Sequence, residues 1–196
     1  MLSEAMLFGF AAGFLLGGSL RSLAKASFRG LPLIFASAAI DIVLTTRVGV
    51  YVASLGSWAL IAAMVLQTAL LVLFVLGNME KPSLWLIGLG GLMNAIAVVA
   101  NSGKMPISPE ILSIAPCSPY TIALLQGRVA NYVLATSSTR FLALSDIILF
   151  RGFTFYMISA GDMVTSAGLI VLVISLMMAF PAKKEPDKSE THVEEA

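Results

Sequence analysis

The residues of this sequence best able to do chemistry are three aspartates in or beside long apolar stretches, Asp41, Asp146 and Asp162. A charged side chain inside a bilayer costs on the order of 2.5–3.5 kcal/mol, so each carboxylate should be paired, protonated or facing water. Any two of them could in principle form a carboxylate pair. Their spacing in the sequence does not show that they meet.

Asp41 lies well inside an apolar stretch, and its expected partners are arginines. Arg47 can reach back from the membrane surface, although the two are not spaced as helix neighbours, which are three or four residues apart. Arg140 and Arg151 are competing partners. Structural pairing and a role in proton or solute handling remain open alternatives for Asp41.

The other candidate functional polar residues include Gln67, Asn94, Asn101 and Lys104, and the first two more readily have a structural interpretation than a ligand-binding one. Gln67 and Asn94 are the deepest uncharged polar residues of their apolar stretches and are expected to form hydrogen bonds between helices. Asp146, together with Thr139 and Arg140, is interpreted either as a functional polar group or as part of a charge pair that orients the segment around it.

The sequence has few residues for other kinds of catalysis. One cysteine, Cys117, and one histidine, His192, exclude a disulfide within the chain and leave metal and haem sites without ligands. The run Ser159-Ala160-Gly161-Asp162 lacks the second glycine of the Gly-x-Gly-Asp motif of intramembrane aspartyl proteases, and Asp162 is explained as the cap of a helix. The sequence predicts no catalytic residue, no metal and no cofactor, and favours a protein that is not an enzyme.

The composition around these residues is that of an integral membrane protein. The chain has 196 residues, of which 58% are hydrophobic and 12% charged, and its mean hydropathy is +0.93. Soluble chains carry about 25% charged residues, and here the deficit falls in uninterrupted apolar blocks. A net charge of +1 without a clustered basic face gives no support to nucleic-acid binding.

We predict an all-α fold, a helical transmembrane bundle of five spans in a single domain over residues 1–180. A helix needs roughly 20 mostly apolar residues to cross a bilayer core about 30 Å thick. The polar tail at 181–196 cannot bury apolar surface and is expected to be disordered. The five spans are expected at about residues 2–20, 30–46, 58–77, 84–100 and 162–180.

Small residues recur at every fourth position of the first predicted span. Such a ridge lets another helix approach closely. The partner is either another helix of the same chain, or a second copy or partner subunit. The ridge consists of Ala5, Gly9, Gly13 and Gly17.

Basic residues set the expected orientation, because short loops rich in Lys and Arg stay in the cytoplasm. With five crossings, the basic loop at 21–30, Lys81 and the basic tail fall on one side. We therefore expect the N-terminus outside and the C-terminus inside the cell. Trp58 begins the third span, where an amphipathic ring favours the headgroup level.

The long outer segment, residues 101–161, reads neither as a span nor as a hydrophilic loop. A Ser-Pro pair predicts a short helix over about 108–114, because serine caps a first turn and proline is tolerated there. A second Ser-Pro pair predicts an amphipathic helix over about 118–135, lying on the outer membrane face or capping the bundle. The apolar stretch 141–150 is too short to cross and is expected to be interfacial or re-entrant.

Three separated motifs resemble those of an uncharacterised family of small bacterial multi-pass membrane proteins. They are Asn101-Ser102-Gly103-Lys104-Met105-Pro106, Thr139-Arg140-Phe141 running to Leu144-Ser145-Asp146, and Ser159-Ala160-Gly161-Asp162. The family usually has a glycine where Ser102 stands, and often a histidine in the segment 128–134, which has none here. The resemblance covers the five spans. It implies a shared fold in a bacterial inner membrane and no activity.

Two functions fit these features. The first is a non-enzymatic structural or accessory subunit of a membrane assembly, whose partners are the lipid bilayer and a second copy or a larger complex. The alternative is a small-solute or lipid transporter, proton-linked through Asp41, with Arg140 and Asp146 near its outer mouth. A water-accessible cavity that reaches Asp41 would distinguish them, since transporters require one and packing subunits do not.

Overall fold

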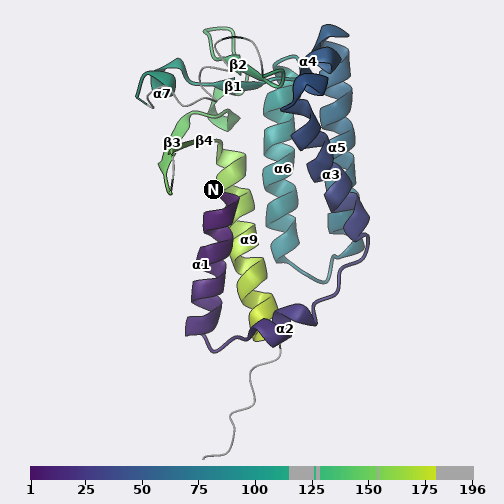
Figure 1. The fold of residues 1–196 in the computed structure, drawn as a ribbon, viewed down its shortest axis with the longest axis vertical. Helices are drawn as coiled ribbons and strands as arrows, with labels where there is room; N and C mark the ends of the chain where they lie inside the picture. The colour runs from purple at the N-terminus through teal and green to yellow at the C-terminus, as the bar shows by residue number, and fades with distance from the viewer. Residues whose placement is uncertain (115–125, 127–128, 154, 180–196) are drawn as a thin grey trace, which may run out of the picture.

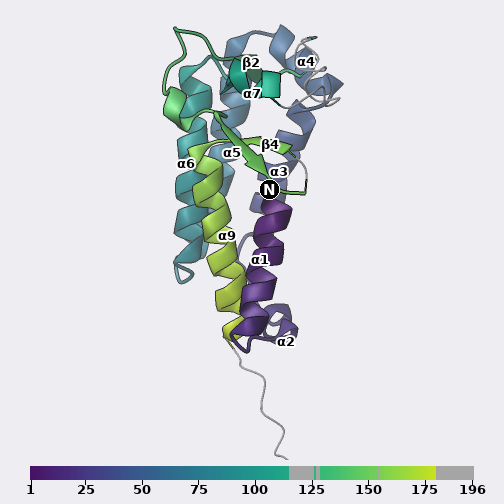
Figure 2. The same ribbon diagram turned by 90° about the vertical axis from the view of Figure 1, so that its left-hand side faces the viewer.

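Five longer helices form an elongated bundle that is capped at one end by short helices and strands (Figures 1 and 2). The computed structural model describes residues 1–114, 126, 129–153 and 155–179. Successive long helices run in opposite directions along the bundle (Figure 1). They are α1 (Leu2–Leu15), α3 (Leu31–Leu44), α5 (Ser57–Gly77), α6 (Ser83–Ala100) and α9 (Ala160–Met178).

Three of these helices are long and apolar enough to cross a membrane, namely α5, α6 and α9. They coincide closely with the predicted third, fourth and fifth spans. A fourth span is present only if α3 and α4 (Arg47–Ser54), which meet at an angle of 81°, are counted as one. Five full spans are therefore not confirmed: three helices of the described chain, or four if the bent pair is one span, have the length and composition to cross a membrane.

The first predicted span is shorter than expected. Helix α1 ends at Leu15, and the chain turns at Gly17, whose φ of +82° favours glycine. At about 1.5 Å per residue, 14 residues cover about 21 Å of a core about 30 Å thick. A short helix, α2 (Leu20–Ala24), follows, and its first turn is capped by Ser19.

The bend after α3 has a local cause in two threonines. The hydroxyls of Thr45 and Thr46 donate to the carbonyls of Ile42 and Val43, and Thr46 then accepts from the backbone N–H of Val48 to start α4. Side chains that take backbone partners in this way compete with the helix ladder. The second predicted span therefore stops at Leu44 instead of near residue 46.

The small residues of α1 pack against α9 of the same chain. A Cβ at Gly9 would touch the side chain of Val173, and a Cβ at Gly13 would clash with Met177. Ala5 is buried as well. Gly17 lies beyond the helix, and nothing described lies within 4 Å of the position of its absent Cβ.

Helices α6 and α9 approach each other even more closely, through glycines on both partners. A Cβ at Gly90 would clash with the Thr165 side chain and the Gly161 carbonyl, and a Cβ at Gly168 would press on Leu86 and Ile87. This contact fixes the N-terminus of α9 beside the middle of α6. It therefore positions Asp162 against α6.

The described part of the chain between α6 and α9 contains four strands, although we predicted an all-α fold. Strand β1 (Met105–Ile107) pairs in parallel with β2 (Tyr132–Leu134), and β3 (Ile148–Arg151) pairs antiparallel with β4 (Phe155–Ile158). The all-α prediction is corrected accordingly. The fold remains mostly helical.

The predicted elements of this segment have different outcomes. The short helix is confirmed as α7 (Pro109–Ile114). Most of the predicted amphipathic helix, at 118–125 and 127–128, lies outside the described residues, but its end is wrong, since Tyr132–Leu134 forms β2. The stretch 141–150 becomes a 3-10 turn at Leu142–Leu144 and then β3. Aromatic and branched side chains suit a strand when a partner strand is available, as β4 is for β3.

Large apolar side chains cover the outside of the bundle. On α5, Val65, Leu66 and Leu73 are each more than half exposed, and only 22% of the most apolar window of this helix is buried. Soluble monomers rarely expose continuous apolar surface on this scale. The apolar helices thus indicate a membrane protein.

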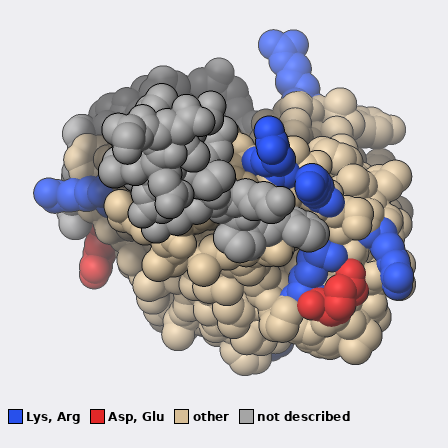
Figure 3. Space-filling model, turned by 90° about the horizontal axis from the view of Figure 1, so that it is seen from below, with Lys and Arg blue, Asp and Glu red and all other residues tan. Residues whose placement is uncertain are grey.

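Two of the basic regions meet at one end of the bundle. Asn78, at the turn between α5 and α6, accepts from the backbone N–H of Arg29 and donates to its carbonyl, both at 2.8 Å. Lys81 lies in the same turn and pairs with Glu80. Seen from this end, the exposed charges are mostly basic (Figure 3). The basic tail lies outside the part of the chain that the structure describes.

Candidate functional site: a carboxylate-lined cavity

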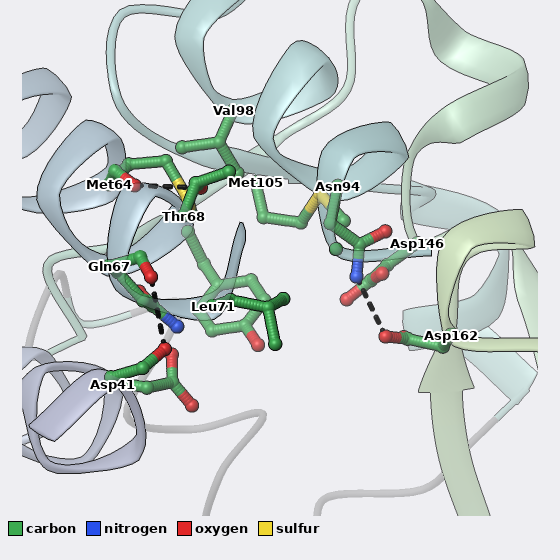
Figure 4. A pocket seen from close by; sticks show the side chains of 13 residues that line it. Asp41, Met64, Gln67, Thr68, Leu71, Asn94, Val98, Met105, Asp146 and Asp162 are labelled. Atoms are coloured by element: carbon green, nitrogen blue, oxygen red, sulfur yellow. Dashed lines mark hydrogen bonds between the residues drawn. The ribbon is translucent and has the colours of Figure 1, made fainter. Parts of the chain in front are cut away.

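A cavity of about 210 Å³ lies between α3, α5, α6, the start of α9 and the β1–β2 pair (Figure 4). Met105 and Tyr132, which are register partners in the two strands, both line it. At about 30 Å³ per molecule, the cavity has room for roughly seven waters. Its polar lining residues are Ser37, Asp41, Gln67, Thr68, Asn94, Tyr132, Asp146 and Asp162.

Asp162 and Asn94 form the best-ordered wall of the cavity. The Asn94 Nδ2 donates to Asp162 Oδ1 at 2.8 Å, which joins α6 to α9. The Ser159 hydroxyl donates to Asn94 Oδ1 at 2.7 Å and accepts from the Asp162 backbone N–H at 2.9 Å. The Ser159 N–H in turn donates to Asp162 Oδ2 at 3.1 Å, which completes a capping box. Both carboxylate oxygens of Asp162 are thus occupied.

Asp146 is held beside this wall by its backbone. Its N–H donates to the Pro106 carbonyl at 2.9 Å, and its carbonyl accepts from the Ser108 N–H at 3.2 Å, so it forms a bridge alongside β1. Its side chain is buried, and its Oδ1 has no hydrogen-bond partner among the described residues. Burial raises the pKa of the Asp146 carboxyl to about 8, and the negative charge of Asp162 adds to the effect.

Asp41 and Gln67 lie across the cavity from these groups, on α3 and α5 (Figure 4). Ser37 ties the two helices together by donating to the Gln67 carbonyl at 3.1 Å. The Gln67 Oε1 is buried without a described partner. Asp41 is exposed and therefore lies where the cavity opens.

The cavity has many acceptors and no compensating cation in the described lining. Three carboxylates line it, and the lining includes neither Lys nor Arg. The arginines that we considered as partners of Asp41 make no ion pair with it: the ion pairs of the described chain join Glu4 to the N-terminal amine and Glu80 to Lys81. Buried acceptors normally find donors. This arrangement is suited to protons, water, or a small ligand that donates hydrogen bonds.

The other predicted site residues lie away from the cavity. Arg47 begins α4 beyond the bend. Asn101, Lys104, Thr139 and Arg140 line a separate, wider groove at the capped end of the bundle.

The sequence indicated Asp41, Asp146 and Asp162 as separate candidates and did not predict that they line the same cavity. It missed Ser37, Thr68 and Tyr132 as lining residues. Serine and threonine bond readily to backbone carbonyls within helices, as Thr68 does to Met64, so their presence in an apolar helix carries little signal. The spacing of Ser159 and Asp162 is that of a helix cap, and the structure has a capping box at these residues.

A mostly helical architecture, an apolar outer surface and an acidic cavity within the bundle define a class of small polytopic membrane protein. Within that class, the chain belongs to a family of unknown function (DUF5317), whose model matches residues 25–174. The match includes every residue that lines the cavity and leaves out α1. Neither the curated proteins nor the solved structures gave a match.

Proposed function

We propose that this protein is a proton-linked carrier of a small solute, and that the solute binds in the cavity between Asp41 and Asp146. The observation that carries the proposal is the cavity itself, which reaches Asp41 from within an apolar bundle. A protein that only packs against partners gains nothing from such a space, because unfilled polar cavities cost stability.

The chemistry of the lining favours a cationic solute that donates hydrogen bonds. Gln67 Oε1 and Asp146 Oδ1 are buried acceptors without described partners, and they lie on opposite sides of the cavity. An organic cation with several N–H groups would satisfy both and would offset the carboxylate charge. A free anion would meet three carboxylates and no Lys or Arg in the described lining.

Asp146 supplies a proton to exchange. With its pKa raised to about 8, this carboxyl holds a proton near neutral pH when the cavity is empty. A bound cation would favour the ionised form and release that proton. Binding and proton release are then one linked event, as an exchanger of protons for cations requires.

The bent helix pair provides a place where the cavity could open. Asp41 stands near the end of α3, close to the 81° bend before α4. Interrupted helices next to a polar site are the usual construction of secondary transporters. Opening would then need only movement of α3 and α4 relative to α5.

A structural or accessory subunit, the first of the two functions that fit the sequence, is favoured in part by the small-residue ridge of α1. Two members of that ridge, Gly9 and Gly13, face α9 of the same chain. The ridge is therefore covered internally and gives no support to a docking role.

Binding of the guanidinium ion to the purified protein in neutral detergent tests the proposal. Guanidinium stays charged at all relevant pH values, so it reports cation binding without a proton of its own. Calorimetry in two buffers of different ionisation enthalpy would count the protons released. We expect saturable binding, about one proton released per ion near pH 7, and at least about tenfold weaker binding by Asp41→Asn and Asp146→Asn.

Glu80→Gln is the matched control, because it removes one acidic group at the far end of the bundle. It should bind guanidinium as the unmodified protein does. Equal binding by all four proteins, or saturable binding without proton release, would contradict the proposal. Proteoliposomes with an internal pH indicator would then show whether a guanidinium gradient moves protons.

A further inference from the structure

A second and larger hollow lies at the capped end of the bundle. It has a volume of about 670 Å³ and lies between the start of α5, the end of α6, β2 and the turn that follows β2. It is separate from the acidic cavity: Met105 of β1 and Tyr132 of β2 line the cavity, whereas Lys104, the residue before β1, and Val133 of β2 line this groove. The charged residues that line the groove are basic, whereas those that line the cavity are acidic.

Two cationic side chains line the groove, and its described lining contains no Asp or Glu. Lys104 is half-buried and Arg140 is exposed, and neither makes an ion pair within the described chain. Ser57, Ser102, Ser138 and Thr139, which carry hydroxyl groups, line the same groove. Guanidinium, ammonium and hydroxyl groups are the side-chain donors that bind phosphate oxygens.

One residue, Asn101, bonds the backbone of both cationic residues: its side chain holds Arg140, and its main-chain carbonyl holds Lys104. Its Oδ1 accepts from the Arg140 N–H at 3.0 Å, and its Nδ2 donates to the Arg140 carbonyl at 2.8 Å. The Lys104 N–H donates to the Asn101 carbonyl. The backbones that carry the two cationic side chains are therefore hydrogen-bonded to the same residue in the absence of ligand.

The start of α5 adds to the positive potential. Ser57 is the first residue of this 21-residue helix, and no side chain caps its N-terminus, where Gly56 precedes it. The free N–H groups and helix dipole at such an end attract negative charge. Three positive features from separate parts of the chain thus converge on one groove.

We infer that this groove binds a phosphate group through Lys104, Arg140 and the start of α5. The neighbouring Trp58 is two-thirds exposed, as suits a ring at the headgroup level of a membrane, so the phosphate belongs either to an anionic lipid headgroup or to a soluble phosphate compound. The inference does not depend on cation transport through the acidic cavity.

Thermal unfolding of the purified protein in neutral detergent tests this directly. The probes are inorganic phosphate, glycerol 3-phosphate and dihexanoyl phosphatidylglycerol, with dihexanoyl phosphatidylcholine for comparison. A ligand that binds the folded state raises the unfolding temperature with its concentration. We expect the phosphate probes to do so, with an apparent affinity at least about tenfold weaker in the double variant K104Q/R140Q.

The double variant R47Q/R151Q is the matched control, because it removes the same charge and alters two other arginines, neither of which lines the groove. It should respond to phosphate as the unmodified protein does. If K104Q/R140Q is too unstable, the single variants K104Q and R140Q, with rescue by K104R, give the same comparison. Unchanged phosphate response in the groove variants, or equal loss in the control, would overturn the inference.

The probes also separate the two sources. A response to phosphatidylglycerol alone supports a lipid headgroup, and a response to free phosphate and glycerol 3-phosphate alone supports a soluble compound. A response to phosphatidylcholine equal to that to phosphatidylglycerol, with none to free phosphate, would contradict phosphate recognition. Asp146→Asn should leave every one of these responses intact, which keeps this test independent of the acidic cavity.

Discussion

The side chain of Asn101 binds the backbone of Arg140 on both sides, accepting from its N–H and donating to its carbonyl. It also donates to the Ala97 carbonyl at 2.7 Å and so closes the end of α6. Asn78 does the same at the end of α5 with the backbone of Arg29. An asparagine can substitute for a strand partner in this way because its amide carries one acceptor and two donors.

Replacing Asn101 by alanine should lower the free energy of unfolding by about 1–3 kcal/mol, because three side-chain hydrogen bonds are lost, of which the bond to the Ala97 carbonyl is partly buried. Amide hydrogen exchange should rise at Arg140 and its neighbours. Ser54→Ala is the control, because the Ser54 hydroxyl bonds only within its own helix, to Tyr51. Unchanged exchange at Arg140 in the Asn101 variant would show that this clamp does not hold the segment.

The same clamp explains how the three sequence motifs relate in space. Asn101 of the first motif holds Arg140 of the second, and Asp146 of the second lies along β1 of the first. Asp162 of the third meets Asn94 of α6. The sequence did not predict that the three motifs lie together, because its local pattern carries no information on a contact between a helix end and a turn 39 residues later.

Long apolar helices could be predicted from the sequence, and the acidic cavity could not. Length and composition placed α5, α6 and α9 nearly to the residue, because a lipid-facing helix needs a continuous apolar run. The bend after Leu44 and the strands at 105–107 and 132–134 depend on side-chain bonds and on partners distant in the sequence. Local pattern therefore overestimated both helix length and helix content.

Ser102→Gly should stabilise the protein by up to about 1 kcal/mol. Ser102 has a φ of +60°, a left-handed conformation that costs a residue with a side chain roughly 1–2 kcal/mol, and Gly103 follows at +82°. Glycine loses more entropy on folding, which offsets part of the gain. Ser138→Gly, at an exposed position of the same groove where φ is not positive, is the control and should not stabilise. A lower unfolding temperature for Ser102→Gly would contradict this account.

Gly90→Ala should weaken the α6–α9 contact. The added methyl group would meet the Thr165 side chain and the Gly161 carbonyl, so the helices must move apart at a cost of about 1–3 kcal/mol. Gly77→Ala adds the same methyl group to α5 in nearly open space, where its nearest described neighbour is Arg29 at 3.9 Å. Thermal unfolding should therefore separate the two variants. Equal stability would show that α6 and α9 adapt without strain.

The Gly90 variant also has a consequence for the cavity. Asn94 lies one helical turn after Gly90, and its bond to Asp162 requires that α6 and α9 stay close. Guanidinium binding should weaken together with the stability. In contrast, the phosphate response of the groove at Lys104 and Arg140 should be retained, because that groove does not involve α9.

Stability should fall as pH rises from about 4 to about 8, because Asp146 keeps its proton in the folded state over this range. Its carboxyl has a pKa of about 8 when folded and near 4 when unfolded, so the folded state binds more protons between these values. The stability that the protonated form contributes is fully present below pH 4 and is lost as pH rises through 8. Asp41, Asp162 and Tyr132 are the other titratable groups that line the same cavity.

Asp146→Asn mimics the protonated form and should remove most of this pH dependence. The variant should be more stable than the unmodified protein at pH 8 and close to it at pH 4, as unfolding temperatures in one detergent across this range would show. Glu110→Gln, a change to an exposed acid on α7, should leave the slope unchanged. A slope that persists unchanged in Asp146→Asn would contradict the assignment of this proton to Asp146.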